Sequence, residues 1–229
     1  TVPLPETPEG NISIDALPML KEFLPRVEVL ALGPGLSMGE ETGKLVRSLV
    51  PGLKLPTVID ADGLNNLALE PKILRRVRAP LVITPHPGEL SRLLGKRIGE
   101  IERERIGFAQ KAAREFGAAV VLKGAPTVTA EPRGSAYINS TGNSGLATAG
   151  SGDVLTGIIA GMMAQGLSPL DAGIVGAYLH GLAGDMAALE LTAYGVVAGD
   201  ILDRVPQAIR AALEEEMKEH EGPVLRRPL

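Results

Sequence analysis

The sequence predicts an α/β fold with a mostly parallel central sheet, helices on both faces of that sheet, and a short antiparallel hairpin at one edge. Two patterns indicate this. Short apolar runs alternate with helical segments as far as residue 122, which is typical of parallel strands buried on both faces. Two short strands around a turn come next, as expected of an edge hairpin. At 229 residues and 45% hydrophobic content, the chain is long enough for one large core.

The parallel strands are expected where a short apolar run stops at a glycine, a proline or a charged residue. These runs cover residues 27–32, 57–59, 81–84 and 119–122. Helical patterns follow the strands at 40–50, 63–69, 88–94 and 101–116. The hairpin strands are expected at 127–130 and 136–139, around Pro132-Arg133-Gly134, and three further helices at 153–165, 169–191 and 198–216.

We expect a single domain over 1–229, because no linker interrupts the pattern. The Pro- and Gly-containing residues 1–11 are expected to be a loop, and residues 217–229 a charged tail. The chain begins with Thr1 rather than methionine. That start suggests the interior of a longer protein.

Composition excludes several classes of function. The formal net charge is −4 and only 3% of residues are aromatic, so no basic stripe with interleaved aromatics favours nucleic-acid binding. The absence of cysteine excludes disulfides and thiolate catalysis. No signal peptide is visible, and the apolar run at 154–164 is too short to span a bilayer. We therefore expect a cytoplasmic protein that does not insert into membranes.

The most informative segment is the glycine-rich stretch 139–157, NSTGNSGLATAGSGDVLTG. It leads into an apolar helix, so the backbone N–H groups of Gly150, Ser151 and Gly152 and the positive end of the helix dipole would face an anion. A terminal phosphate could bind there, with Asp153 accepting a proton from a substrate hydroxyl that attacks phosphorus. The alternative is a glycine-rich turn that an aspartate caps.

Four other motifs lie directly after the predicted parallel strands: GPGLS (33–37), DADGLN (60–65), TPHPGE (84–89) and KGAPT (123–127). In such sheets ligands bind outside the carboxyl ends of the strands. The four motifs and the glycine-rich stretch are therefore expected to line one cleft.

Individual residues in these motifs allow two interpretations. Asp60 and Asp62 could hold Mg²⁺ with a nucleotide phosphate, through water in the case of Asp60, or Asp62 could cap the next helix. His86 could be a packed residue or, with Glu89 nearby, a substrate ligand. Lys123 could extend to the rim or bind phosphate, and Gly124 would permit close approach of a ligand. His180, on an apolar helix, is expected to be packed.

Two motifs resemble nucleotide-binding fingerprints without matching them. Residues 39–44 resemble a P-loop but are one residue short, and Leu45 stands where Ser or Thr should hold magnesium. Residues 33–39 resemble a dinucleotide fingerprint, but the third glycine comes late and Asp60 lies too far along the chain. A Rossmann dehydrogenase is thus a minor alternative.

Taken together, LALGPGL, VIDADGLN, TPHPGE, KGAPT and the run 139–169 resemble the NAD(P)H-hydrate dehydratases of the ribokinase-like superfamily. The resemblance covers nearly all of residues 12–212. It implies a ribokinase-like fold and a repair reaction. The hydroxyl of hydrated NADH or NADPH is phosphorylated at the expense of ADP, or of ATP in eukaryotes, with Mg²⁺, and phosphate is then eliminated.

The resemblance also implies roles for individual residues. Gly35, His86 and Asp153 match positions that contact the hydrated dinucleotide, and we add Asn65 to them. The adenine nucleotide is assigned to Lys123, Gly124, Ala125, Pro126, Thr127, Gly142, Asn143, Gly150, Ser151 and Gly152. Family members are often tetramers, and in many microbes the domain is fused to an epimerase.

The sequence departs from the family at its start, because family members usually begin earlier with glycine-rich strand–helix units. We therefore expect that these units are missing here or supplied by another chain. Two other functions stay open at this point. One is a kinase of the same superfamily acting on a sugar or vitamin alcohol, and the other is a non-catalytic nucleotide-binding fragment.

Overall fold

The computed structural model describes residues 1–220, with side chains for residues 1–214. Most of the predicted charged tail, residues 221–229, therefore lies outside the described residues. The chain divides into two compact units. The first comprises residues 1–140 and 155–177, and the second comprises residues 141–154 and those from 178 onwards.

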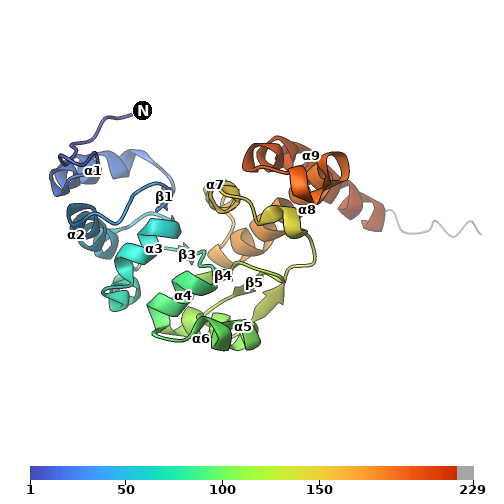
Figure 1. The fold of residues 1–229 in the computed structure, drawn as a ribbon, viewed down its shortest axis with the longest axis horizontal. Helices are drawn as coiled ribbons and strands as arrows, with labels where there is room; N and C mark the ends of the chain where they lie inside the picture. The colour runs from blue at the N-terminus through green and yellow to red at the C-terminus, as the bar shows by residue number, and fades with distance from the viewer. Residues whose placement is uncertain (221–229) are drawn as a thin grey trace, which may run out of the picture. The chain divides into compact units, whose positions relative to one another are not determined.

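The first unit contains one six-stranded sheet in the order β1-β2-β3-β4-β5-β6 (Figure 1). The strands are β1 (Leu30–Leu32), β2 (Thr57–Ile59), β3 (Leu81–Ile83), β4 (Ala119–Leu122), β5 (Val128–Ala130) and β6 (Ala136–Ile138). The first four pair in parallel, whereas β5 and β6 are antiparallel. This confirms the predicted mostly parallel sheet with an antiparallel hairpin at its edge.

The helices are α1 (Leu17–Phe23), α2 (Glu40–Leu49), α3 (Ala61–Leu67), α4 (Pro87–Leu94), α5 (Ile98–Arg103), α6 (Arg105–Phe116), α7 (Ser151–Ala164), α8 (Pro169–Gly195) and α9 (Ala198–His220). Sequence reasoning missed α1. It also joined α5 and α6, which Glu104 separates with non-helical dihedrals of φ −129° and ψ 48°. None of the helices within residues 1–220 is long and apolar enough to cross a membrane.

Alternate residues of the strands belong to two separate apolar clusters, as the two-residue repeat of a strand requires. Ile59, Ile83 and Val120 pack in a cluster with buried residues of α2, α3, α4 and α6. Val58, Val82 and Val121 pack in another with α7 residues and the start of α8. The sheet is therefore covered on both faces, as predicted.

The start of α8 approaches the sheet closely because it carries glycines. A Cβ built on Gly173 would lie 3.0 Å from side-chain carbons of Val121 and Thr129, and one on Gly176 would lie 2.5 Å from Ile159. Larger residues at either position would separate the helix from its neighbours.

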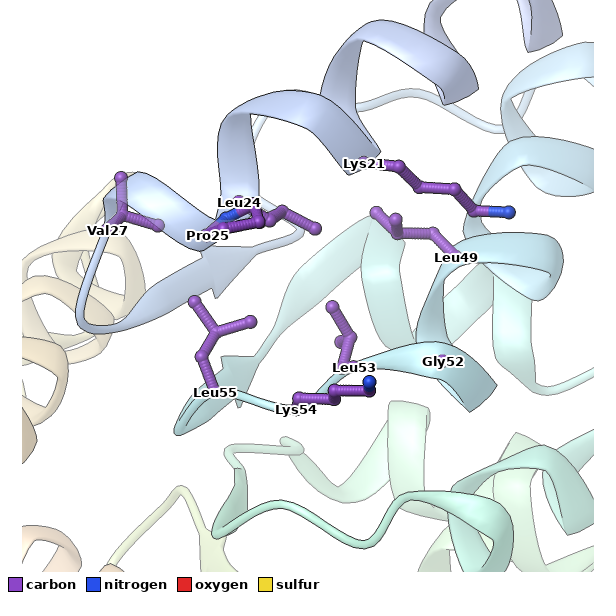
Figure 2. Close-up of a pocket in the computed structure, with 9 residues that line it drawn as sticks. All are labelled: Lys21, Leu24, Pro25, Val27, Leu49, Gly52, Leu53, Lys54 and Leu55. Atoms are coloured by element: carbon purple, nitrogen blue, oxygen red, sulfur yellow. The ribbon is translucent and has the colours of Figure 1, made fainter.

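An apolar hollow of about 420 Å³ lies on the first unit, away from the carboxyl ends of the strands. Figure 2 shows Leu24, Leu49, Leu53 and Leu55 around it. Leu55 precedes β2, so the hollow is at the amino ends of the strands. Sheets of this kind bind ligands at the opposite ends, and none of the predicted site residues lines it.

The approach of β1 to β2 depends on Gly33, which immediately follows β1. Its φ is +139°, and an added Cβ would lie 1.8 Å from the backbone oxygen of Asp60. We predict that Gly33→Ala lowers the free energy of unfolding by about 2–5 kcal/mol, from backbone strain and overpacking.

Urea denaturation measures this change, with Gly99→Ala as the matched control. Gly99 lies in α5 with open space around its Cα, so alanine there should leave stability unchanged or slightly raise it. Equal stabilities for the two variants would contradict the proposed steric constraint.

Candidate active site

A buried carboxylate, Asp60, lies at the carboxyl end of β2 and is 1% exposed. Its Oδ2 accepts a hydrogen bond of 2.8 Å from the hydroxyl of Thr156 on α7. Its Oδ1 lies 2.5 Å from Nζ of Lys123, which follows β4. Both carboxylate oxygens are therefore engaged by groups of the chain, and Asp60 connects two strand ends to α7.

Lys123 turns inward to this carboxylate rather than outward along the surface. Its side chain is 19% exposed, and Nζ lies 3.9 Å from Oε2 of Glu89. Glu89 is itself buried, and this burial raises the pKa of the Glu89 carboxyl while the nearby Lys123 ammonium acts to lower it. One cation is thus placed between two buried acids, and nucleotide binding by Lys123 remains a prediction.

His86 is the N-cap of α4 and forms a capping box with Glu89. Nδ1 of the His86 ring accepts a hydrogen bond of 2.9 Å from the backbone N–H of Gly88. The backbone N–H of His86 donates to Oε2 of Glu89 at 2.7 Å. Partial burial, together with the charge of Lys123, lowers the pKa of the His86 ring and so favours its neutral form. Half of the side chain stays exposed, which leaves the predicted substrate contact open.

The motif after β1 is tied to the motif after β2 by Asp62. Its Oδ2 accepts the backbone N–H of Ser37 at 3.0 Å, and its Oδ1 accepts from Nδ2 of Asn65 at 3.2 Å. Asp62 lies within the first turn of α3, whose N-cap is Asp60. The interpretation of Asp62 as the helix cap is therefore wrong.

Two of the predicted substrate-binding residues, Asn65 and Gly35, differ in how accessible they are to a bound molecule. The Oδ1 of Asn65 accepts a hydrogen bond of 2.7 Å from Arg92 of α4, so this amide is engaged at both ends. Gly35 has φ +71°, and no atom lies within 4 Å of an added Cβ. The backbone at Gly35 is thus accessible to a ligand.

The glycine-rich stretch ends in the second unit at the start of α7. Gly150 has φ +82°, and its carbonyl accepts the N–H of Asp153 at 3.1 Å. The N–H groups of Gly150 and Gly152 donate to none of the described residues. Asp153 is exposed in the first turn of the helix. Unpaired N–H groups at a helix start are the usual binding site for phosphate.

Asp185 of α8 holds the first part of the glycine-rich stretch, which also belongs to the second unit. Its Oδ2 accepts the N–H of Gly142 and its Oδ1 accepts from Nδ2 of Asn143, both at 2.8 Å. The Oδ1 of Asn143 in turn accepts the N–H of Gly145 at 2.8 Å. Sequence reasoning missed Asp185. An acidic residue within an otherwise apolar helix was the signal available for finding it.

Two glycines of α8 let the same stretch lie against the helix. A Cβ on Gly181 would be 2.2 Å from Oγ1 of Thr141, and one on Gly184 would be 2.5 Å from a methyl of Leu146. The buried His180 places Nε2 3.0 Å from Oγ of Ser151. His180 is thus packed, as predicted, and it also contacts the glycine-rich stretch at Ser151.

Direct metal ligands are scarce. Within the described part of the chain, no group of three or more histidines and acidic residues is placed to hold a metal ion. The two oxygens of Asp60 already have partners. This arrangement suits a Mg²⁺ ion held mainly by phosphate oxygens and water, with Asp60 acting only through water.

A sequence profile of the NAD(P)H-hydrate dehydratases matches residues 6–207. The chain belongs to this family. The ribokinase-like fold class inferred from the resemblance is also confirmed, because a solved ribokinase-like superfamily protein from Enterococcus faecalis has a TM-score of 0.73 and 28% identity over 87% of this chain and 69% of its own.

Individual members of the NAD(P)H-hydrate dehydratase family agree with the assignment. A bifunctional NAD(P)H-hydrate repair enzyme from Moorella thermoacetica is 54% identical over 95% of the chain, which spans 41% of that protein. An ADP-dependent (S)-NAD(P)H-hydrate dehydratase from Neisseria meningitidis is 42% identical over 76% of the chain and 60% of its own length. The chain thus spans about two fifths of the first of these relatives.

Among solved structures, the ADP/ATP-dependent NAD(P)H-hydrate dehydratase from Bacillus subtilis, co-crystallized with ATP/Mg²⁺, has a TM-score of 0.71 and 29% identity. The match covers 88% of this chain and 77% of the other.

Because Lys123 compensates the buried Asp60 charge, we predict that Lys123→Met lowers the free energy of unfolding by about 3–5 kcal/mol. The double variant Asp60→Asn/Lys123→Met should recover much of that loss, because the carboxylate that Lys123 contacts at 2.5 Å is then neutral as well and only the more distant Glu89 has lost its cation. Urea unfolding of both variants measures the coupling. Lys44→Met breaks the exposed pair with Glu40, and because exposed ion pairs contribute little, it should leave stability nearly unchanged.

The raised pKa of Glu89 predicts a pH-dependent difference between the wild type and Glu89→Gln. A carboxyl with a raised folded-state pKa contributes stability below its unfolded pKa of about 4.3, and that contribution is lost as pH rises through the folded value. The wild type should therefore lose stability relative to Glu89→Gln as the pH rises above about 4. Denaturant titrations at several pH values measure this, and a constant difference would contradict burial as the dominant effect.

Proposed function

We propose that this chain is an ADP-dependent dehydratase that restores NADH or NADPH from the hydrated (6S) form. The observation that carries the proposal is the start of α7, where Gly150 and Gly152 offer unpaired N–H groups and the exposed Asp153 follows at once. Family membership over residues 6–207 supports the substrate. The names of the N. meningitidis and B. subtilis relatives support an adenine nucleotide as the phosphoryl donor.

In the first chemical step, the hydroxyl on the nicotinamide ring attacks the terminal phosphorus of ADP, and AMP leaves. Asp153 accepts the hydroxyl proton. The N–H groups of Gly150 and Gly152 stabilise the charge on the transferred phosphoryl group. When bound, Mg²⁺ would neutralise phosphate charge, held by phosphate oxygens and water near Asp60.

In the second step, the carbon–oxygen bond to phosphate breaks and phosphate departs with the bonding electrons. The ring nitrogen supplies electrons, and a proton leaves the adjacent ring carbon, so that the dihydronicotinamide is restored. Gly35, Asn65 and His86 are proposed to hold the hydrated dinucleotide. Lys123 to Thr127, with Gly142 and Asn143, are proposed to hold the adenine nucleotide.

The proposal extends to the setting of the reaction. The bifunctional M. thermoacetica relative supports an association with an epimerase domain, as expected from the resemblance. We also propose that the protein acts as a homotetramer in the cytoplasm.

The direct test uses the full-length protein with ADP, Mg²⁺ and hydrated NADH. We expect recovery of dihydronicotinamide absorbance near 340 nm, with AMP and phosphate formed in equal amounts. No recovery would reject the proposal. A stable phosphorylated product without elimination would instead identify a small-molecule kinase, and ADP binding without turnover would identify a non-catalytic module.

We predict that Asp153→Asn lowers turnover at least about 100-fold, as expected for loss of a general base, while the Kd for ADP stays nearly unchanged. Asp171→Asn is the matched control, because Asp171 is also an exposed first-turn aspartate, on α8. Steady-state kinetics and calorimetry measure the two quantities. Turnover of Asp153→Asn close to that of the control would remove Asp153 from its role.

A further inference from the structure

Arg105 occupies a position that is unfavourable for a cation. It is the first residue of α6, where the positive end of the helix dipole repels it. The side chain is partly buried, and burial lowers the pKa of the Arg105 guanidinium. Among the described residues, no carboxylate forms an ion pair with it. Its placement therefore needs an explanation other than charge pairing.

The guanidinium of Arg105 is bound to three backbone carbonyls at the carboxyl end of β4. Nε donates to the oxygen of Pro126 at 3.0 Å. Nη2 donates to the oxygens of Leu122 and Lys123 at 3.2 and 2.9 Å. One rigid planar group thus joins the beginning and the end of the KGAPT loop, residues 123–127.

Gly124 makes this contact possible. Its φ is +145°, and an added Cβ would lie 2.5 Å from Nη2 of Arg105. The glycine is therefore needed to admit the guanidinium, which gives a different reason from the ligand approach that the sequence suggested. The hydroxyl of Thr127 also donates to the oxygen of Gly124 at 3.1 Å, so the loop is closed from both sides.

The arginine also fixes the direction of a backbone donor. Because the peptide group is planar, the Pro126 carbonyl that faces Arg105 turns the N–H of Thr127 to the opposite side of the loop. That N–H donates to none of the described residues. The loop thus presents an unpaired N–H on the side that the arginine does not cover.

We propose that Arg105 is a positioning residue for nucleotide binding, which holds the KGAPT loop so that the Thr127 N–H can reach the adenine nucleotide. The inference rests on the proposed assignment of this loop to ADP. Arg105 acts through the loop and takes no part in the proton transfer that is assigned to Asp153.

Calorimetric titration of the full-length protein with ADP alone tests this independently of turnover. We expect Arg105→Gln to raise the Kd for ADP at least tenfold, and Arg105→Lys to raise it less, because an ammonium can reach one of the three carbonyls. Arg103→Gln, which replaces an exposed arginine two residues earlier on α5, should stay within twofold of the wild type.

Kinetics separate positioning from general damage to the fold. In Arg105→Lys the KM for ADP should rise while the KM for hydrated NADH stays within twofold. An unchanged Kd for ADP in both Arg105 variants, or an equal rise of both KM values, would overturn the inference. If the wild-type protein binds ADP but does not restore NADH, the proposed reaction is rejected. The ADP titrations of the Arg105 variants still test the positioning role in that case.

Discussion

The carboxylate of Asp60 is the constraint on which the first unit depends. Removing a charge from water costs several kcal/mol, so the carboxylate of Asp60, whose residue is 1% exposed, needs hydrogen-bond donors for both of its oxygens. Lys123 and Thr156 supply them from β4 and α7. As a result, a strand two positions away in the sheet and a helix on one of its faces are held to the end of β2.

The charged residues around Asp60 pair with one another, which distinguishes them from the groups of the candidate site that could bind a ligand. Asp60, Glu89 and Lys123 have their charges largely satisfied by one another. In the second unit, the described residues at the start of α7 include unpaired backbone N–H groups and the exposed Asp153, which are available for a ligand. A phosphoryl-transfer site needs such fixed donors more than it needs covalent chemistry from the protein, because its transition state differs from the ground state mainly in charge distribution. Asp185 bonds to Gly142 and Asn143 of the glycine-rich stretch, and Arg105 bonds to three carbonyls of the KGAPT region, so each is suited to hold its own loop in place.

The sequence predicted the strands and the motifs that follow them because both are local features. Apolar runs that stop at Gly33, Asp60 or Lys123 carry the information within a few residues. Arg105 was missed because its partners lie about twenty residues ahead, and nothing near it in the sequence indicates that carbonyls will converge there. Helix α1 was missed for a different reason. Pro18 within it and Pro25 shortly after it suggest a loop when the packing of the segment is unknown.

The glycines of α8 carry a consequence for how this helix forms. Gly173 and Gly176 admit the sheet and α7, and Gly181 and Gly184 admit the glycine-rich stretch. Each glycine lowers intrinsic helix stability by about 1 kcal/mol relative to alanine. An excised peptide covering α8 would therefore be largely unstructured in water. We therefore expect the helical order of this segment to depend on its packing against the sheet, α7 and the glycine-rich stretch.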